Sequence, residues 1–191
     1  MAKSEFTLYT AHCRSDKNNT SYPQAVRVTD IESLKRAVSL DHVSARYKDG
    51  YAKKDTGHKD LIRAHRAITE YDGADAIMFD CDNTPANDKE PDIPPEKWVT
   101  PEHVKAAFPG VSFCVAYSRN HMKQKGKYSA RPRFHCYFAI DPIADATEFA
   151  ALKDKVCAYF PQFDMNAKDS ARFFYGVKNP QVEFYESEGG Q

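Results

Sequence analysis

The 191-residue sequence lacks several features that mark common protein classes. No hydrophobic run approaches the roughly 20 residues that a membrane-spanning helix needs, and the N-terminus has no apolar signal-peptide core. The five cysteines include no CxxC pair, so we expect reduced core thiols of a cytoplasmic protein rather than a zinc site or a disulfide framework. Basic and acidic residues number 27 each, so no overall charge attracts the chain to nucleic acid or to a membrane.

The zero net charge hides a local separation of charge. Residues 72–102 contain nine acidic residues against two lysines, whereas residues 118–135 contain six lysines and arginines and no acidic residue. A site that holds a metal ion next to a phosphate needs such a separation. Two solvated loops of opposite charge are the alternative interpretation.

A short apolar run, residues 77–79, leads into Asp80-Cys81-Asp82. Successive side chains of a strand alternate between faces, so Asp80 and Asp82 are predicted to project together. Two adjacent carboxylates repel each other and favour a divalent cation between them, and oxygen ligands suit Mg²⁺ or Mn²⁺. The alternative is a strand that ends in a polar turn capped by Asn83.

Hydrophobic periodicity and turn residues predict a mixture of strands and helices in one domain. The predicted strands cover residues 5–10, 25–28, 77–82, 111–117, 133–140 and 182–185, and the predicted helices cover residues 29–40, 58–71, 100–108 and 145–160. The basic, aromatic segment 41–56 is predicted to be a loop that is either solvated or in contact with nucleic acid. The proline-rich, acidic segment 84–99 is predicted to be a long loop, either at the rim of a site or on a plain surface.

The strand over residues 133–140 carries charge on one face. Phe134, Cys136 and Phe138 point one way, and the opposite face carries Arg133 and His135. An arginine and a histidine on one face are costly to bury without anionic partners. This face must therefore meet solvent, acidic side chains or a ligand, and the face that carries Asp80 and Asp82 is the candidate acidic partner.

The order of these motifs resembles the archaeo-eukaryotic primase superfamily, in particular the primase-polymerase domains of phages, prophages and plasmids. The matching segments are Phe79–Asn83, Tyr117–Asn120, Arg133–Phe138, Phe163-Asp164 and Asp169–Arg172, within roughly residues 77 to 178. One departure concerns the second motif, which usually reads Ser-x-His. Arg133 occupies the serine position here, and Ser118 or Ser129 is expected to replace that contact.

The resemblance implies an α/β (α+β) fold with an RRM-like catalytic module and an N-terminal α/β module. Residues 1–191 would form one primase-polymerase catalytic domain, the N-terminal part of a longer replication protein in a bacterial host or phage-infected cell. The implied activity is a metal-dependent nucleotidyl transfer, by a DNA primase, a DNA polymerase or both. Its partners would be a single-stranded DNA template, nucleoside triphosphates and a helicase region or partner, although the sequence itself contains no Walker motif.

The resemblance also assigns the site residues. Asp80, Asp82 and Asp164 would hold Mg²⁺ or Mn²⁺, and His135 would complete the catalytic set. The expected nucleotide-binding residues are Ser118, Arg119, Arg133, His135, Asp169, Arg172 and Lys178, with the loop lysines 123, 125 and 127 nearby. Asp169 competes with Asp164 as the third metal ligand, and we favour Asp164 because Asp169 precedes Arg172 by three residues and is placed to orient it.

Two other functions remain as alternatives at this point. Asp80, Asp82 and Thr84 also resemble the Asp-x-Asp-x-Thr motif of haloacid-dehalogenase-type phosphatases, in which Asp80 would be the nucleophile and Asp82 a general acid/base. That motif normally lies near the start of a chain, and no Gly-Asp-x-x-x-Asp follows. A non-catalytic RRM-like domain that binds nucleic acid is the second alternative, but it leaves the two carboxylates unexplained.

Overall fold

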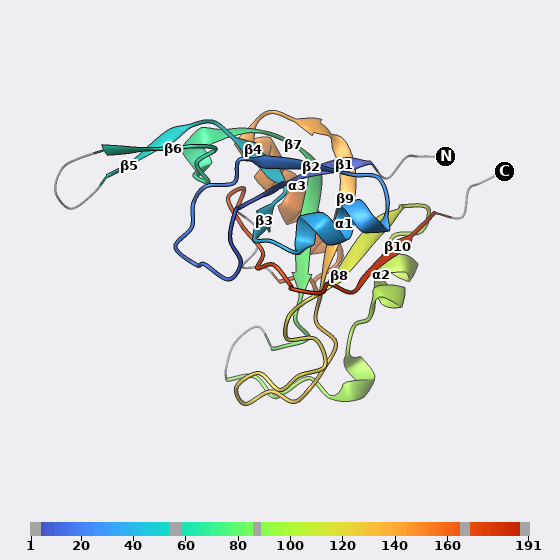
Figure 1. Ribbon diagram of the computed structural model, residues 1–191. Coiled ribbons are helices and arrows are strands. Elements are labelled where there is room, and N and C mark those ends of the chain that lie inside the picture. Colours follow the sequence, from blue (N-terminus) through green and yellow to red (C-terminus); the bar gives the residue numbers. More distant parts are fainter. Residues whose placement is uncertain (1–4, 54–58, 86–88, 165–168, 188–191) are drawn as a thin grey trace.

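A computed structural model describes residues 5–53, 59–85, 89–164 and 169–187 (Figure 1). The N-terminal part contains β1 (Phe6–Thr10), β2 (Gln24–Val28), α1 (Ile31–Val38), β3 (His42–Val43), β4 (Ala45–Tyr47), β5 (Gly50–Lys53), β6 (Lys59–Ile62) and η1 (Ile68–Glu70). The remainder contains β7 (Tyr71–Cys81), η2 (Pro95–Lys97), α2 (Pro101–Ala107), β8 (Phe113–Tyr117), β9 (Phe134–Ile143), α3 (Ala146–Tyr159) and β10 (Val182–Tyr185). None of the helices in these ranges is long and apolar enough to cross a membrane.

The central sheet has five antiparallel strands in the order β10-β8-β9-β7-β4. Along the chain, the six elements β7, α2, β8, β9, α3 and β10 follow the strand–helix–strand–strand–helix–strand order of an RRM-like unit, and β10 pairs with β8. β4, from the N-terminal part, pairs with the free edge of β7. A second sheet, β2-β1-β3, and α1 form the N-terminal layer, so the predicted α+β class is confirmed.

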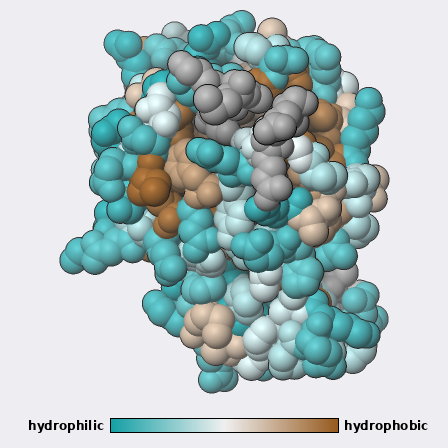
Figure 2. All heavy atoms as spheres, turned by 90° about the vertical axis from the view of Figure 1, so that its right-hand side faces the viewer, coloured by the Kyte–Doolittle hydropathy of each residue, from teal (hydrophilic) through white to brown (hydrophobic). Residues whose placement is uncertain are grey.

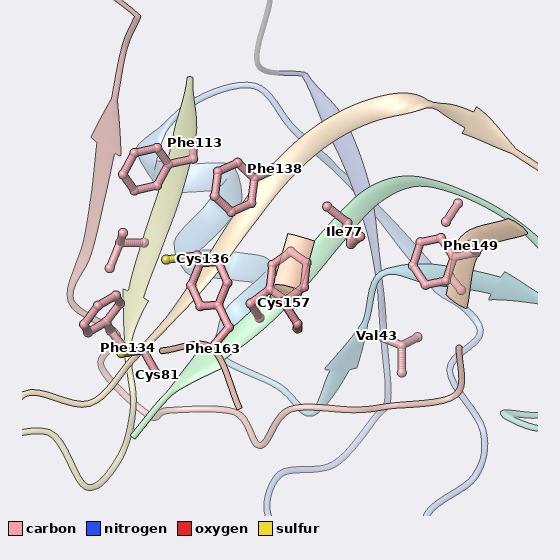
Figure 3. Packing of buried hydrophobic residues seen from close by; sticks show 14 of the residues in the cluster. Val43, Ile77, Cys81, Phe113, Phe134, Cys136, Phe138, Phe149, Cys157 and Phe163 are labelled. Atoms are coloured by element: carbon pink, nitrogen blue, oxygen red, sulfur yellow. The ribbon is translucent and has the colours of Figure 1, made fainter. Parts of the chain in front are cut away.

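Alternation along β7 and β9 creates one core on each face of the central sheet. On one face, Phe79 belongs to the same buried cluster as Phe138, Phe163 and, on α3, Phe149 and Cys157. Figure 3 shows the last four of these side chains. The opposite face packs against β1 and α1; its buried residues include Ala76, Met78 and Tyr137 of the sheet and Phe6, Leu8 and Leu34 of the N-terminal layer. The sheet is thus covered on both faces by packed elements.

The structures predicted for two segments were wrong. Among the described residues, 59–71 do not form a helix and 41–53 are not one loop, because the two segments pair as the antiparallel ribbon β5-β6 and residues 42–47 supply β3 and β4. Residues 54–58 of these predictions lie outside the described part of the chain. The apolar spacing that predicted the helix does not mark a buried face: Leu61 and Ile68 are 54% and 58% exposed. In Figure 1 the ribbon extends away from the body of the protein.

Three of the four predicted helices are present. α2 begins at Pro101 after the N-cap Thr100, at the start of the predicted range 100–108. The N-cap of α1 is Asp30, whose side chain pairs with Ser33, one residue after the start of the predicted range 29–40. In α3 the buried face includes Lys153, whereas Tyr159 is 65% exposed.

The loops that follow β7 and β8 project together beyond the end of the central sheet (Figure 1). Asn83, which has a left-handed φ of 52°, joins them: its side chain donates to the carbonyls of Val99 and Pro132 at 2.8 and 2.9 Å. The fully buried Arg131 guanidinium donates to both oxygens of Asp92 at 2.7 and 2.6 Å. Bidentate pairing of this kind fixes geometry as well as charge. Hydrophilic residues predominate on the face of the molecule that Figure 2 shows.

Asp41 joins three segments of the N-terminal layer. Its buried carboxylate accepts backbone hydrogen bonds from Ser15, Asp16 and Gly176 at 2.8, 2.9 and 2.8 Å. Gly176 lies so close to the chain that a Cβ there would be 2.5 Å from the carbonyl carbon of Leu40. The carboxylate therefore holds the segment that follows Phe174 against the start of β3.

Asp41→Asn is expected to destabilise the protein, because the amide NH₂ replaces one accepting oxygen and leaves a buried N–H group without an acceptor. A buried N–H group without an acceptor lowers the free energy of unfolding by about 1–3 kcal/mol. Urea unfolding should show a decrease of that size. The matched control is Asp141→Asn, an exposed position on β9 that should unfold like the wild type. Equal stabilities of the two variants would contradict the role of Asp41.

Candidate active site

The two carboxylates of the Asp-x-Asp motif lie at the end of β7 on the face that packs against the N-terminal layer. Asp80 pairs with His135 of β9 in the sheet register, two positions beyond the pairing of Met78 with Tyr137. The predicted alternation is confirmed, since Met78 and Tyr137 belong to one core and Phe79 to the other. Asp80, Asp82, Arg133 and His135 therefore share a face, as expected from the sequence.

The third carboxylate is brought to the site by an aromatic stack and a backbone hydrogen bond. Phe163 stacks on Phe79 with ring centroids 4.6 Å apart and an interplanar angle of 12°. The next residue, Asp164, donates its backbone N–H to the carbonyl of Asp80 at 2.8 Å. Burial of Phe163 thus fixes Asp164 beside the strand that carries Asp80 and Asp82.

The surroundings of Asp80 disfavour its ionised form. Its side chain is 17% exposed, and burial, followed by the charges of Asp82 and Asp164, raises its pKa from 3.8 to about 7. Lys125 and Arg172 act in the opposite direction without cancelling this effect. A carboxylate in this position is stabilised by a further positive charge.

Positive side chains surround Asp82. The ammonium group of Lys125 donates to Oδ2 of Asp82 at 2.5 Å, and Nε of the fully buried Arg133 lies 3.6 Å from Oδ1. Arg133 is held in place through Nη1, which donates to the carbonyls of Asn120 and Lys123 at 3.0 and 2.8 Å. The basic segment that follows β8 is therefore folded back onto the carboxylates.

Near these carboxylates, several buried polar atoms of the described residues have no hydrogen-bond partner. They include both acceptors and donors. Oδ1 of Asp80 is an unpaired acceptor, and Nε and Nη2 of Arg133 and Nε of Arg172 are unpaired donors among the described residues. A buried acceptor of this kind suits a cation, and buried guanidinium donors suit an anion. The donor set, three carboxylates, fits Mg²⁺ or Mn²⁺.

No group of three or more histidine, cysteine, aspartate or glutamate side chains within the described ranges is arranged around a common metal position. Asp82 points instead to Lys125, whose ammonium group carries the sign of charge that a metal ion would bring. A cleft of about 490 Å³ opens beside Asp82 and Asp164, bounded by the loop that contains Ile93 and Lys97. The acids thus lie at the edge of a space large enough for a small molecule.

Other predicted residues lie outside this cluster. Arg119 is exposed, stacks its guanidinium on Tyr175 at 4.2 Å and donates to Ser15, while Ser118 donates its backbone N–H to the Arg133 carbonyl. Lys178 is exposed and, in the part of the chain that the structure describes, forms no ion pair with the three aspartates.

Asp169 does not form the expected ion pair with Arg172 in the described structure. Its carboxylate accepts a hydrogen bond from the backbone N–H of Ala171 at 2.9 Å, and its carbonyl accepts one from Arg172 at 3.4 Å. Asp169 therefore shapes the turn that carries Arg172 through backbone contacts. The buried ammonium of Lys153 reaches the same Asp169 carbonyl at 3.3 Å.

The surroundings of His135 were not predictable from the sequence. Its ring stacks on Phe174 with centroids 4.0 Å apart, and His42 and Tyr137 lie behind it. Burial, followed by the charges of His42, Arg172 and Lys125, lowers the pKa of His135 to about 3. The alternation of residues along β9 places Tyr137 on the same face as His135. No pattern in the sequence pointed to His42, because it lies in the segment 41–56 that was predicted to be a loop.

Comparisons with known proteins give one distant likeness. No protein-family model and no curated protein matches the chain. Among solved structures, the AEP domain of the primase-polymerase from cyanophage S-2L is similar, with 14% sequence identity and a TM-score of 0.44 over 98% of this chain and 83% of that chain. Because a match of this size is distant, the assignment of site residues rests on the contacts described above.

Asp80→Asn is expected to raise the melting temperature in metal-free buffer at about pH 8, because it removes a buried negative charge beside two others. An acid with a higher pKa in the folded protein binds more protons there, so stability falls as pH rises from 3.8 to about 7. Asp80→Asn has no carboxyl group to ionise, so it does not lose stability over this pH range. Its melting temperature should therefore equal that of the wild type near roughly pH 4.

Thermal unfolding of Asp80→Asn, Asp141→Asn and the wild type, in EDTA at both pH values, tests this expectation. Asp141→Asn alters an exposed carboxylate on the neighbouring strand and should show no such difference between the two pH values. A lower melting temperature of Asp80→Asn at the higher pH would show that the carboxylate charge is compensated in the folded protein.

Proposed function

We propose that this chain is a metal-dependent nucleotidyltransferase that synthesises DNA or a primer on a single-stranded DNA template. One observation carries the proposal: an unpaired buried carboxylate oxygen of Asp80 lies among three acids, next to buried, unpaired guanidinium donors of Arg133 and Arg172. Groups of this kind suit a cation and a phosphate bound side by side. Nucleotidyl transfer requires that combination.

Asp80, Asp82 and Asp164 are the residues assigned to the divalent cation, Mg²⁺ or Mn²⁺. When bound, the cation would stabilise the charge on the attacking and leaving oxygens. The stack of Phe163 on Phe79 and the backbone bond from Asp164 to Asp80 hold the acids on two separate segments in one place. Asp80 and Asp164 are therefore side by side before the substrate arrives, whereas Asp82 must exchange Lys125 for the cation.

Arg133, Arg172 and Lys125 are the residues assigned to the triphosphate. Arg133 is buried and fixed by two backbone carbonyls, so its remaining donors are held in a constant direction. Lys125 is half exposed and bound to Asp82, so it is free to exchange that partner for a phosphate oxygen. Charge-assisted hydrogen bonds to phosphate are strong in such a partly desolvated site.

The cleft beside Asp82 and Asp164 is assigned to the incoming nucleotide. Exposed Arg119, Lys178 and the lysines at 123 and 127 are assigned to the phosphates of the template or the nucleotide. Such contacts are sensitive to ionic strength and carry little sequence information. A helicase region or partner, by analogy with the primase-polymerases that the sequence resembles, would supply the template strand.

Incubation with a single-stranded template, labelled nucleotides and Mg²⁺ or Mn²⁺ tests the function. Products made without an annealed primer would establish priming, and extension of a primer alone would indicate a polymerase. Asp164→Asn should reduce the rate by a hundredfold or more, on the order expected for a lost transition-state contact. Asp169→Asn should mainly raise the nucleotide KM, because its contacts only shape the turn that carries Arg172.

Asp141→Asn serves again as the control and should retain full activity. If Asp164→Asn behaves like this control while Asp169→Asn is inactive, the two roles must be exchanged. Hydrolysis of a small phosphate ester with no polymer formed, and with phosphate trapped on Asp80, would instead support the phosphatase alternative.

Lys125→Met is expected to have two opposite effects. Without its ammonium group, Asp82 loses a competing cation, so Mn²⁺ should bind the free enzyme more tightly. The nucleotide loses a phosphate contact, so its KM should rise, by roughly tenfold for a charge-assisted bond of about 1.5 kcal/mol. Calorimetric titration with Mn²⁺ and steady-state kinetics measure the two effects.

Lys127→Met is the matched control on the same loop, two residues further along. Its ammonium group lies over the ring of Tyr128 at 5.3 Å rather than on Asp82. This variant should leave Mn²⁺ affinity unchanged. Equal Mn²⁺ affinities of Lys125→Met and the wild type would show that the ion pair with Asp82 does not compete with the metal.

A further inference from the structure

A chain of buried polar groups extends from the site into the N-terminal layer. Nδ1 of His42 lies 2.9 Å from the carbonyl oxygen of Leu40, and its Nε2 lies 2.8 Å from the Tyr137 hydroxyl. The same hydroxyl lies 3.5 Å from Nδ1 of His135, whose Nε2 is 3.6 Å from Oδ1 of Asp80. His42 and Tyr137 are fully buried, so water does not compete for these contacts.

The direction of each hydrogen bond follows from the first one. A carbonyl oxygen only accepts, so Nδ1 of His42 carries the proton. A neutral His42 then has a lone pair on Nε2, and the Tyr137 hydroxyl must donate to it. The tyrosine oxygen is left as an acceptor, so the proton of His135 belongs on Nδ1, facing that oxygen.

This assignment requires His42 to be neutral. Complete burial lowers its pKa from 6.5 to about 4, and Asp41 counteracts this effect only in part. A charged His42 would donate from both nitrogens and reverse the direction of the Tyr137 hydroxyl. At neutral pH the ring therefore donates to Leu40 and accepts from Tyr137.

Backbone pairing fixes the two histidine rings relative to each other. His42 and Phe174 exchange backbone hydrogen bonds of 3.0 and 2.9 Å. Phe174 in turn stacks on the His135 ring with an interplanar angle of 19°. The backbone pairing of His42 with Phe174 therefore also fixes the plane of the His135 ring.

We propose that the Leu40 carbonyl, His42 and Tyr137 form a positioning relay that holds His135 as its Nδ1–H tautomer, so that Nε2 is a nitrogen ligand for the divalent cation beside Asp80. In this tautomer, Nε2 of His135 and Oδ1 of the ionised Asp80 are both acceptors, and they face each other without a shared proton. A cation satisfies both atoms. The ligand role rests on the proposed function, whereas the tautomer does not.

The role of His135 changes accordingly. A neutral imidazole protonated on Nδ1 cannot donate from Nε2 to a triphosphate oxygen, which was the contact expected from the resemblance. The phosphate contacts then fall to Arg133, Arg172 and Lys125. His42 and Tyr137 act only through His135 and are positioning residues.

The relay is tested by long-range proton–nitrogen NMR correlation of the metal-free protein labelled with ¹⁵N-histidine, with each of the seven rings assigned through single histidine-to-glutamine variants. His42 and His135 should both show a protonated Nδ1 and an unprotonated Nε2. Tyr137→Phe removes the acceptor of His135 and should shift its proton to Nε2, towards Asp80, with His42 unchanged. His42→Phe should cause the same shift, because the Tyr137 hydroxyl is then free to donate to His135.

Tyr47→Phe is the matched control, since it removes another buried tyrosine hydroxyl, one that donates to the Ser170 carbonyl at 2.5 Å. The His135 pattern should not change in this variant. A wild-type His135 protonated on Nε2, or a pattern that neither relay variant alters, would overturn the relay.

The ligand role is tested by the hyperfine coupling of histidine nitrogen to bound Mn²⁺ in electron paramagnetic resonance. The wild type should show nitrogen coupling that is lost in His135→Gln. Tyr137→Phe should weaken Mn²⁺ binding by roughly tenfold, a typical effect for a lost ligand-orienting contact, and Tyr47→Phe should not. Bound Mn²⁺ without nitrogen coupling would overturn the ligand role alone, whereas a wild type that binds no Mn²⁺ would overturn the proposed function and leave the relay to the NMR result.

Discussion

The register between β7 and β9 is the constraint on which the site depends. Opposing Met78 to Tyr137 and Asp80 to His135 buries one apolar layer under β1 and α1 and gathers the charged residues of the same rows at the end of the sheet, where they are largely buried. A slip of one residue would turn the carboxylates into the phenylalanine core on the other face. The apolar interior therefore specifies the site, although no core residue takes part in its chemistry.

Three separate segments converge on the end of β7, and each is held by a different interaction. The aromatic stack of Phe163 brings Asp164, the two carbonyls that accept from Arg133 fix the basic segment, and the backbone turn at Asp169 carries Arg172. The acids raise the pKa of Asp80, while the cations keep the cluster folded without a ligand. A site that contains both signs of charge is close to neutral, which makes its burial tolerable.

The parts of this architecture that were predictable from the sequence depend on local pattern. Alternation in residues 133–140, the apolar lead-in to Asp80 and the cap at Thr100 are each readable within a few residues. The β5-β6 ribbon was missed because its pairing partners, not its own periodicity, decide its structure. The loop lysines were expected near the site, but the pairing of Lys125 with Asp82 spans 43 residues of sequence. His42 reaches Tyr137 over 95 residues, so its role depended on tertiary packing that no local pattern encodes.

Asn83 and Arg131 connect the two loops that follow β7 and β8. The amide of Asn83 bonds both loops, and the Arg131–Asp92 pair closes them further out. The cleft wall at Val99 and the segment that presents Lys125 are therefore connected by short, buried bonds. A displacement of one loop therefore moves the other, so the width of the cleft and the position of the Lys125 ammonium group should change together.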